Sequence, residues 1–336
     1  MDLSPRRLVD AALEAPVLTS FTRIGPAVRS RLEGWTPLDS YDLTGRTVVV
    51  TGATSGLGLA TATWVARLGA TTVLVGRDAG RTEAAAASIA DLGDVHTALA
   101  DLGDLAQVRR LAADLSARFP RIDALVHNAG ALTADRRVNA DGIEQTVASQ
   151  VVGPFLLTSL LLPALRAAAP GRVITVSSGG MYAAPLTVEH LQMGDDYRGA
   201  EQYARAKRAQ VTLNEMWADT VPASDVVFHA MHPGWADTPG VAESLPTFRR
   251  IVGPLLRTPD EGADTIVWLI ADDGEPAATS GGFWLDRRRR SLHRLPNTRR
   301  SDTPAHRSRL WDWVAEAAQA PAAQAGAGLT ASVRGT

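Results

Sequence analysis

The chain has 336 residues, of which 45% are hydrophobic and none is cysteine, and its formal net charge is −2. This near-neutral balance gives no global field for nucleic acid, and the lack of cysteine excludes disulfides, thiolate catalysis and cysteine-bound metal. The first residues lack the apolar core of a signal peptide, and the longest apolar run, 151–165, is too short to span a membrane. We therefore expect a soluble, cytoplasmic protein without a transmembrane segment.

Short apolar stretches alternate with helical ones from residue 45 onward. Strands are expected at 47–51, 71–75, 95–100, 122–127, 172–177, 225–231 and 281–286. Helices are expected between them at 57–69, 81–93, 104–118, 140–168, 201–219 and 262–271. Such spacing requires right-handed crossovers and a parallel sheet covered on both faces. The pattern predicts one doubly wound α/β domain of the Rossmann type, with seven parallel strands, over residues 45–295.

Two segments flank the predicted domain. Residues 1–44 carry apolar positions at loose helical spacing, interrupted by Pro16 and Pro26. A packed arm is the favoured interpretation, and a docking helix or a peripheral membrane contact is the alternative. At the other end, 296–336, we expect a helix whose tryptophans pack on the domain, around 310–317, and then a disordered alanine- and glycine-rich tail.

A glycine-rich loop, TGATSGLG, directly follows the first predicted strand and opens the first helix. Glycine leaves no Cβ where the chain turns and where a pyrophosphate approaches the backbone. The helix N-terminus offers unpaired N–H groups and a positive dipole end to phosphates. This context predicts a dinucleotide site formed by Thr51, Gly52, Thr54, Ser55, Gly56, Leu57 and Gly58.

The end of the second strand bears on which nicotinamide cofactor binds. An enzyme that prefers NAD places a carboxylate there for the ribose 2′-hydroxyl, whereas this chain has Gly76 followed by Arg77. A guanidinium can pair with a 2′-phosphate, so NADP(H) is favoured. NAD(H) stays an alternative cofactor for two reasons: Asp78 lies close by, and Arg77 could simply be a solvated arginine.

Two further turns follow predicted strands at the same edge of the sheet. Asp101 and Leu102 come after the third strand, where the Asp101 carboxylate could accept from the adenine amine. The fourth strand leads into a tight turn over the cofactor, made by Asn128, Ala129 and Gly130.

Lys207 is the only lysine among 34 lysine and arginine residues. Tyr203 precedes it by four positions, so both side chains share one face of a predicted helix. A phenol has a pKa near 10 and is a poor acid–base group at neutral pH. We expect the Lys207 ammonium and an oxidised nicotinamide to lower the pKa of Tyr203, which then exchanges a proton with a substrate oxygen. Lys207 could also hold the nicotinamide ribose hydroxyls.

A serine at the end of the fifth strand could stabilise negative charge on the substrate oxygen. Ser178 is the first choice for this role and Ser177 the alternative. No nucleophile elbow is present, so hydrolysis is disfavoured. His229 and His232 have no carboxylate at ligand spacing, and no metal site is predicted.

Taken together, TGATSGLG, ADL, HNAG, VSS, YARAK and HPGWADT resemble the short-chain dehydrogenase/reductase family in order and spacing, from residue 45 to about 290. Several further segments, including SFTRIGPAVRSRLEGW in the arm, are similar to a narrower subgroup of that family. The resemblance implies a homodimer or tetramer and catalytic roles for Ser178, Tyr203 and Lys207. It also implies a loop over the nicotinamide that contains Pro233, Gly234, Trp235 and Thr238.

One position departs from the family pattern. Gln150 stands where the family has an asparagine that positions a proton-relaying water beside the lysine. The same amide on a longer arm could shift or weaken that relay.

The favoured function is an NADP-dependent carbonyl reductase or alcohol dehydrogenase. The segment from Trp235 to Arg257 is expected to cover an apolar substrate. The rival is a catalytically silent dinucleotide-binding sensor or scaffold, and Gln150 is the feature that favours it. The basic run at 287–290 is expected to be a solvated face or a subunit contact, with an acidic ligand as the minority reading.

Overall fold

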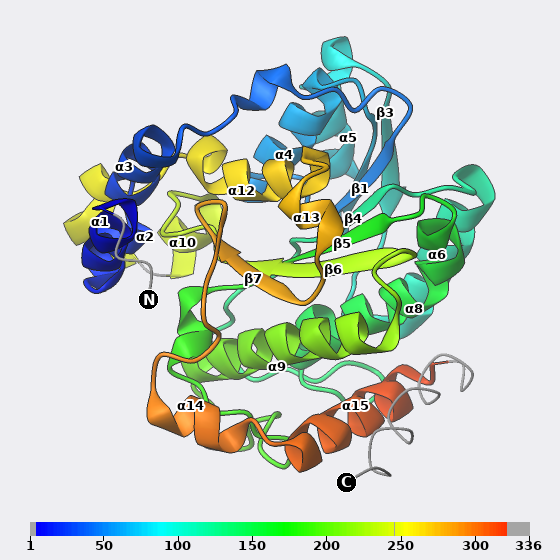
Figure 1. The fold of residues 1–336 in the computed structure, drawn as a ribbon. Helices are drawn as coiled ribbons and strands as arrows, with labels where there is room; N and C mark the ends of the chain where they lie inside the picture. The colour runs from blue at the N-terminus through cyan, green and yellow to red at the C-terminus, as the bar shows by residue number, and fades with distance from the viewer. Residues whose placement is uncertain (1–4, 245, 321–336) are drawn as a thin grey trace, which may run out of the picture.

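The computed structural model describes residues 5–244 and 246–320 (Figure 1). Its strands are β1 (Thr47–Thr51), β2 (Thr71–Gly76), β3 (Val95–Leu99), β4 (Ala124–His127), β5 (Gly171–Val176), β6 (Val226–Met231), β7 (Gly282–Leu285) and β8 (Arg288–Arg289). They form one sheet in the order β3-β2-β1-β4-β5-β6-β7-β8. The predicted Rossmann-type α/β architecture is therefore confirmed. The predicted strand number is wrong by one, because β8 folds back antiparallel to β7.

The helices lie on both faces of the sheet (Figure 1). The longer ones are α4 (Gly56–Arg67), α5 (Ala79–Ala87), α6 (Leu105–Arg118), α8 (Gly153–Arg166), α9 (Gly199–Thr220), α12 (Pro259–Ala271) and α15 (Pro304–Ala318). The shorter ones are η1 (Leu38–Ser40), η2 (Ala90–Leu92), α7 (Gln145–Val147), η4 (Gly179–Tyr182), α10 (Pro239–Ser244), α11 (Pro246–Val252), η5 (Gly253–Leu255), α13 (Glu275–Ala278) and α14 (Pro296–Ser301). Helices α4, α5 and α12 cover one face, and α6, α8 and α9 cover the other.

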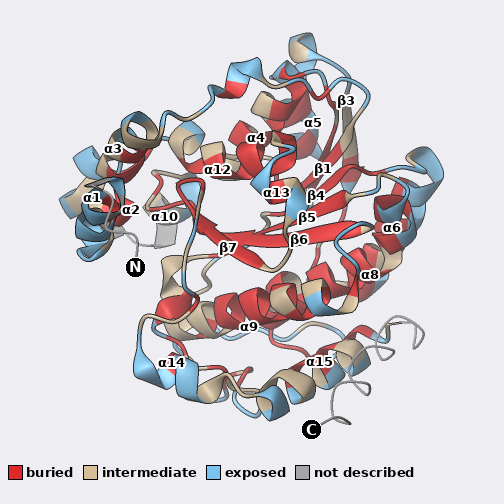
Figure 2. Cartoon of the chain, in the orientation of Figure 1, coloured by how far each residue is buried: buried red, intermediate tan, exposed pale blue. Residues whose placement is uncertain are grey.

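The side chains of each strand alternate between two hydrophobic cores, as the pleat requires. In β1, Val49 enters the core under α6, α8 and α9, whereas Val48 and Val50 enter the core under α4 and α12. Figure 2 shows the central strands as almost wholly buried. A parallel sheet buried on both faces explains why these strands read as continuous apolar runs.

The most apolar helical segment begins later than the sequence suggests. Gly142 has a φ of +76°, and the Glu144 carboxylate caps the helix by accepting from the N–H groups of Thr146 and Val147. The helix therefore starts at Gln145 rather than near 140, and it passes through a π-helical segment, η3 (Ala148–Val152). Over Gln145–Arg166 its hydropathy of 1.6 would suit a membrane span, but 83% of the window is buried inside the protein.

In the described part of the amino-terminal arm, η1 is preceded by three α-helices, α1 (Pro5–Glu14), α2 (Val17–Phe21) and α3 (Ile24–Glu33). They pack beside the β7–β8 hairpin, and ion pairs join the two. Arg290 pairs with Asp10, and Arg288 pairs with both Asp10 and Glu33. The prediction of a solvated basic run is thus wrong for Arg288 and Arg290, whose counter-charges the arm supplies. Arg287 pairs with Asp264 of α12, and Arg289 is exposed, as predicted.

The carboxy-terminal helix α15 packs its tryptophan into the core, as predicted. The Trp311 ring lies 5.0 Å from the ring of Phe155 and 4.9 Å from that of Trp217, between centroids. The predicted disordered tail falls largely on residues 321–336, which lie outside the described residues.

Candidate active site

The predicted site residues gather at the carboxyl edge of the sheet. Strand β1 pairs with β2 on one side and β4 on the other, so the strand order reverses between β1 and β4. The registers place Thr51 opposite Val75, and Val176 opposite Met231, so the strand ends are level. Such a reversal opens the crevice in which doubly wound sheets bind ligands.

The glycine loop has the close contacts that its residues require. Gly52 has a φ of +64°, and a Cβ on it would stand 2.8 Å from the Cα of Ala129. A Cβ on Gly58 would lie 2.3 Å from the Gly52 carbonyl oxygen. Ser55 precedes α4 without capping it through its side chain, which leaves the first N–H groups of the helix for a phosphate. Thr54 lies against Gly76, and Leu57 lies against α12 at Gly262.

The ends of β1 and β4 are tied together by hydrogen bonds. The Asn128 amide donates to the carbonyl oxygens of Thr51 and Gly52 over 3.0 and 3.1 Å. The Thr51 hydroxyl accepts from the N–H groups of Asn128 and Ala129, each over 3.1 Å. Gly130 follows and is exposed. The turn is therefore held rigidly next to the glycine loop.

Crowding keeps the end of β2 free of a side chain. A Cβ on Gly76 would stand 2.1 Å from the Thr82 hydroxyl, so a carboxylate cannot be built there without rearrangement. Arg77 is exposed. Asp78 caps α5, since its carboxylate accepts from the Arg81 N–H over 2.8 Å. The Asp78 carboxylate, which left NAD(H) as an alternative cofactor, is thus engaged in capping a helix.

Asp101 and Leu102 form the corresponding turn after β3. The Asp101 carboxylate accepts from the Gly103 N–H over 2.8 Å, and the Asp101 N–H donates to the side chain of Gln107 over 3.0 Å. Asp101 is half-buried and Leu102 is buried. The turn is thus preformed. Only one carboxylate oxygen of Asp101 accepts the bond from Gly103, and the other could accept from the adenine amine.

Ser178, Tyr203 and Lys207 come together although they lie on different elements. The Ser178 hydroxyl lies near the Tyr203 phenol, where as a hydrogen-bond donor it lowers the pKa of that phenol. Lys207 Nζ lies 5.3 Å from the centre of the Tyr203 ring and donates to the Val176 carbonyl oxygen over 3.0 Å. Ser177 instead places its hydroxyl 3.4 Å from the Lys207 carbonyl oxygen. The geometry favours Ser178 over Ser177 for contact with a substrate.

Burial sets the pKa values of this group. It raises the pKa of Tyr203 to about 12, an effect that the hydrogen bond from Ser178 partly opposes. It also lowers the pKa of Lys207 to about 7. In the protein without a cofactor, removal from water outweighs any effect of Lys207 on the pKa of Tyr203. The lower pKa expected with an oxidised nicotinamide bound stays a prediction.

Gln150 lies in the π-helical segment beside Lys207. Its amide donates to the Ala131 carbonyl oxygen over 2.8 Å. Its Oε1 atom and Lys207 Nζ both lie within 3.4 Å of the point where a Cβ on Gly130 would stand. The long side chain thus brings its amide next to the lysine.

The Oε1 atom of Gln150 is buried without a hydrogen-bond partner among the described residues. The same holds for the side-chain oxygens of Gln210 and Asn214, and all three residues line a cavity of about 30 Å³. The rest of the lining is mixed and includes the apolar rings of Phe155, Trp217 and Phe228. A cavity of that size has room for one water molecule, and the three unpaired acceptors would be its partners.

The loop after β6 closes the site from the other side. Gly234 has a φ of +76°, and a Cβ on it would meet the Arg257 guanidinium at 2.1 Å. Thr238 lies against the glycine loop, since a Cβ on Gly56 would stand 3.2 Å from its methyl group. Pro233 is buried and Trp235 is half-buried. The structure therefore brings this loop together with the glycine loop, as expected for residues around one cofactor.

Sequence reasoning missed three residues that shape the site. The Gln210 amide donates to the Gln150 carbonyl oxygen over 2.5 Å and so holds the π-helical turn. Its position three residues after Lys207 on the same helix was an available signal. Phe21 and His232 meet beside Ser178, with ring centroids 4.3 Å apart. Nothing in the sequence indicates that a residue of the arm reaches this point.

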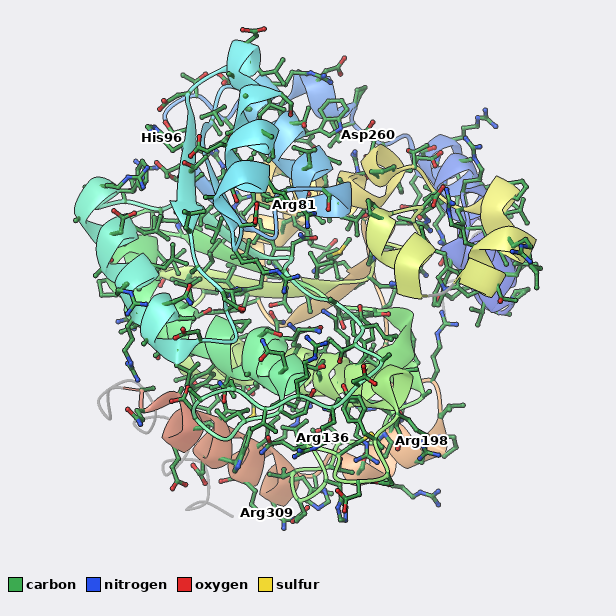
Figure 3. The ribbon with its side chains drawn as sticks, turned by 180° about the vertical axis from the view of Figure 1, so that it is seen from behind. Arg81, His96, Arg136, Arg198, Asp260 and Arg309 are labelled. Carbon is green, nitrogen blue, oxygen red and sulfur yellow. The ribbon has the colours of Figure 1, made fainter. Side chains whose placement is uncertain are left out.

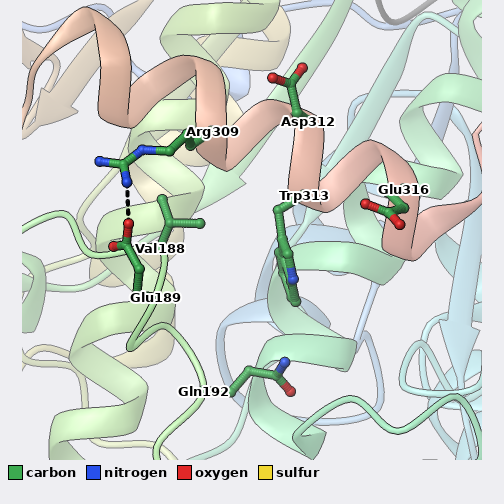
Figure 4. Close-up of a pocket in the computed structure, with 7 residues that line it drawn as sticks. All are labelled: Val188, Glu189, Gln192, Arg309, Asp312, Trp313 and Glu316. Carbon is green, nitrogen blue, oxygen red and sulfur yellow. Dashed lines mark hydrogen bonds and ion pairs between the residues drawn. The ribbon is translucent and has the colours of Figure 1, made fainter.

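A separate surface pocket of about 450 Å³ lies away from these residues, between the loop at 188–192 and α15 (Figure 4). An ion pair between Arg309 and Glu189 crosses it, and no predicted site residue lines it. Across the described ranges, no group of three or more His, Asp or Glu side chains is arranged to hold a metal ion.

Comparison with known proteins agrees with this geometry. A family model described as short chain dehydrogenase matches residues 46–247. Dehydrogenase/reductase SDR family member 12 from Homo sapiens is 36% identical over 306 residues, which is 90% of this chain and 95% of the human protein. This similarity confirms the subgroup that the sequence resembles.

Two further relatives are informative. The "Putative daunorubicin C-13 ketoreductase DnrU" of Streptomyces sp. (strain C5) is 39% identical over 251 residues, covering 73% of this chain and 85% of that protein. A short-chain dehydrogenase from Shigella flexneri, solved in complex with NADP, aligns with a TM-score of 0.59 at 25% identity, over 74% of this chain and 100% of its own.

Proposed function

The chain belongs to the short-chain dehydrogenase/reductase family and is an NAD(P)-dependent oxidoreductase, and we propose that it is an NADP(H)-dependent carbonyl reductase or alcohol dehydrogenase. The observation that carries the proposal is the meeting of Ser178, Tyr203 and Lys207 at the carboxyl edge of the sheet, beside the glycine loop. An acid–base phenol with a neighbouring hydroxyl suits proton exchange with a carbonyl or alcohol oxygen.

The hydroxyls of Ser178 and Tyr203 would both face the substrate oxygen. Bound NADPH would supply the hydride to the carbonyl carbon. Ser178 donates a hydrogen bond to the oxygen as negative charge develops there, and Tyr203 transfers its phenolic proton to it. A pKa of about 12 keeps Tyr203 protonated at neutral pH, which is the form that reduction needs.

Lys207 holds the phenol in position and helps to restore its proton. Its bond to the Val176 carbonyl oxygen fixes the amine at the ring of Tyr203. With a pKa of about 7, the amine can give up or accept a proton near neutral pH. The unpaired Oε1 atom of Gln150 and the adjoining cavity, which Gln210 and Asn214 also line, support a water that passes protons toward it.

Three features of the adenosine end support NADP(H) over NAD(H). Gly76 leaves no room for a carboxylate, and Asp78 is engaged as a helix cap. Arg77 is exposed, and so is Arg81, which Figure 3 labels; both would supply guanidinium groups for a 2′-phosphate. The Shigella protein was solved with NADP, which supports the same choice.

The substrate is proposed to be an apolar carbonyl compound or the matching alcohol. The rings of Trp235 and Phe248 meet edge to face, with centroids 5.0 Å apart, in the segment that is proposed to cover the site. The Streptomyces relative is named as a ketoreductase, which supports a ketone as one substrate class.

Turnover tests the proposed reaction directly. NADPH oxidation is measured against a panel of aldehydes, ketones and quinones for the wild type, Tyr203→Phe and Ser178→Ala. We expect turnover with at least one apolar carbonyl, and a fall in kcat of at least about a hundredfold in Tyr203→Phe, because the proton donor is lost. NADPH binding without turnover of any compound would instead support the silent sensor.

The role of Arg77 has its own test. Loss of its guanidinium in Arg77→Ala is expected to weaken NADPH binding by about tenfold, the scale of one charge-assisted hydrogen-bonding pair, and to leave NADH binding unchanged. Titration of cofactor fluorescence measures both affinities, with the exposed Arg110→Ala as a control. Equal affinity of the wild type for the two cofactors would refute the assignment.

A further inference from the structure

The segment 235–257 has both of its ends at the active site. Ala236 and Arg257 form an isolated parallel bridge. The Arg257 N–H donates to the Trp235 carbonyl oxygen, and the Asp237 N–H donates to the Arg257 carbonyl oxygen, each over 2.8 Å. We call residues 235–237 together with Arg257 the lid base.

The arm accepts hydrogen bonds from this lid base. The Phe21 carbonyl oxygen accepts from the Trp235 N–H over 2.7 Å and from Arg257 Nε over 3.0 Å. The Ser20 carbonyl oxygen accepts from Arg257 Nη2 over 2.8 Å. The last carbonyls of a helix have no partner within it, so the lid base satisfies the end of α2.

Buried charges strengthen the junction. Asp286 in the β7–β8 turn accepts from Arg257 over 2.6 Å and from Arg29 of the arm over 2.5 Å. The side chain of Arg29 is 0% exposed, and those of Arg257 and Asp286 are each 2% exposed. Arg29 also pairs with Asp10 and Glu14. Removing one member of such a buried network leaves an uncompensated charge, so the arm cannot detach without cost.

The ring of Phe21 fills the space between the lid base and the Ser178 turn. It stands edge-on to His232 at 4.3 Å and to Trp235 at 5.7 Å, between ring centroids. A Cβ on Gly179 would stand 2.7 Å from Phe21 Cε2. Gly179 directly follows Ser178, so one aromatic ring touches both walls of the crevice.

We propose that the amino-terminal arm is a working part of the active site, in which Phe21 is a positioning residue that sets the spacing between Ser178 and the lid base. This inference rests on the proposed oxidoreductase function. The arm thereby takes part in substrate fit. The lid base that it supports would lie beside the substrate oxygen and would carry the apolar segment that follows it.

The variant Phe21→Ala tests the proposal. Removal of the ring leaves Gly179 and Trp235 without a common support, so the backbone amides of Trp235 and Arg257 are expected to exchange hydrogen at least about tenfold faster. With an active carbonyl substrate, kcat/KM is expected to fall by about tenfold or more, because a small misplacement of the reacting groups is costly. The Kd for NADPH is expected to stay within about twofold, since the glycine loop does not touch Phe21.

Two variants provide controls. Leu18→Ala changes the same short helix at a side chain that is 47% exposed, and it should alter none of these quantities. Phe21→Leu keeps much of the volume and should produce a smaller change in the same direction. If Phe21→Ala fails to fold, Phe21→Leu carries the test.

The outcomes separate this inference from the proposed function. If no carbonyl is reduced even by the wild type, the proposed function fails, and the role of Phe21 is judged by hydrogen exchange alone. NADPH should then slow hydrogen exchange in the Ser178 turn and the lid base of the wild type. It should fail to slow exchange there in Phe21→Ala. Faster exchange with an unchanged kcat/KM would show that the arm only stabilises the fold. Unchanged exchange would also overturn the proposal.

Discussion

Lys207 is held in the apolar interior, with its side chain directed at the Val176 carbonyl oxygen. Burial lowers its pKa from 10.5 to about 7. Between these two values the unfolded chain binds a proton at this amine that the folded protein does not, so stability rises with pH across that window. Below pH 7 the full penalty of burying the charge is present.

We therefore expect Lys207→Met to raise the melting temperature, most strongly below about pH 7, with the gain shrinking as pH rises toward 10.5. Thermal unfolding at several pH values measures the gain. Because this is the only lysine in the chain, selective ¹³C-lysine labelling gives one side-chain signal whose titration reports the pKa directly. A midpoint near the ordinary lysine value would contradict the burial argument.

The residue types of the site could be predicted from the sequence, because the spacing of Tyr203 and Lys207 on a helix fixes their common face. The direction of their pKa shifts could not. It depends on how much water the folded chain removes from each group, which no local pattern encodes. The preference for Ser178 over Ser177 likewise required the hydrogen bond to Tyr203.

At the scale of the element, the π-helical segment η3 aims Gln150 at the lysine. An extra residue in the helical turn is a local departure that often occurs at functional sites. The segment is held by the Gln210 amide and by the bond from Gln150 to Ala131. The sequence pattern predicted one continuous helix here, because periodicity over so many apolar residues does not resolve a single inserted residue.

Replacement of Gln150 tests whether this element serves the reaction. We expect Gln150→Leu to lower kcat by about tenfold to a hundredfold while the Kd for NADPH is unchanged, because the relay loses its amide. The kcat of Gln150→Asn should lie between those of the wild type and Gln150→Leu. Its amide is kept, but the shorter asparagine side chain does not reach the Ala131 carbonyl oxygen as glutamine does. Ser149→Ala, one position earlier, is the matched control. The relay role is excluded if Gln150→Leu retains wild-type kcat at every pH.

At the scale of the whole molecule, the amino-terminal arm and the β7–β8 hairpin, far apart in the sequence, meet around one ion network. Asp10, Glu14 and Arg29 come from the arm, and Asp286 and Arg290 come from the β7–β8 hairpin. Burial opposes ionisation of Asp10, but hydrogen bonds from Arg290 and Arg29 hold the pKa of that carboxyl below its usual range. The arm is thereby joined to the sheet rather than lying free beside it.

The central parallel sheet follows from the alternation of strands and helices, so the sequence could predict it. The arm's position could not be predicted in the same way. Acidic residues on an amphipathic helix look like a solvated face, and Arg290, one of the partners of Asp10, lies 280 residues away. Only the folded chain shows that the basic run and these acids neutralise each other.

The measurement that tests the account most directly is transfer of deuterium from NADPH deuterated at nicotinamide C4 to a ketone or aldehyde. If the proposed site reduces carbonyl compounds, the wild type places deuterium on the carbinol carbon of the product. The Tyr203→Phe variant should still bind NADPH but should not transfer the deuterium. The proposed function would be contradicted by a wild type that binds NADPH and transfers deuterium to no carbonyl compound, or by a Tyr203→Phe variant that transfers it at the wild-type rate.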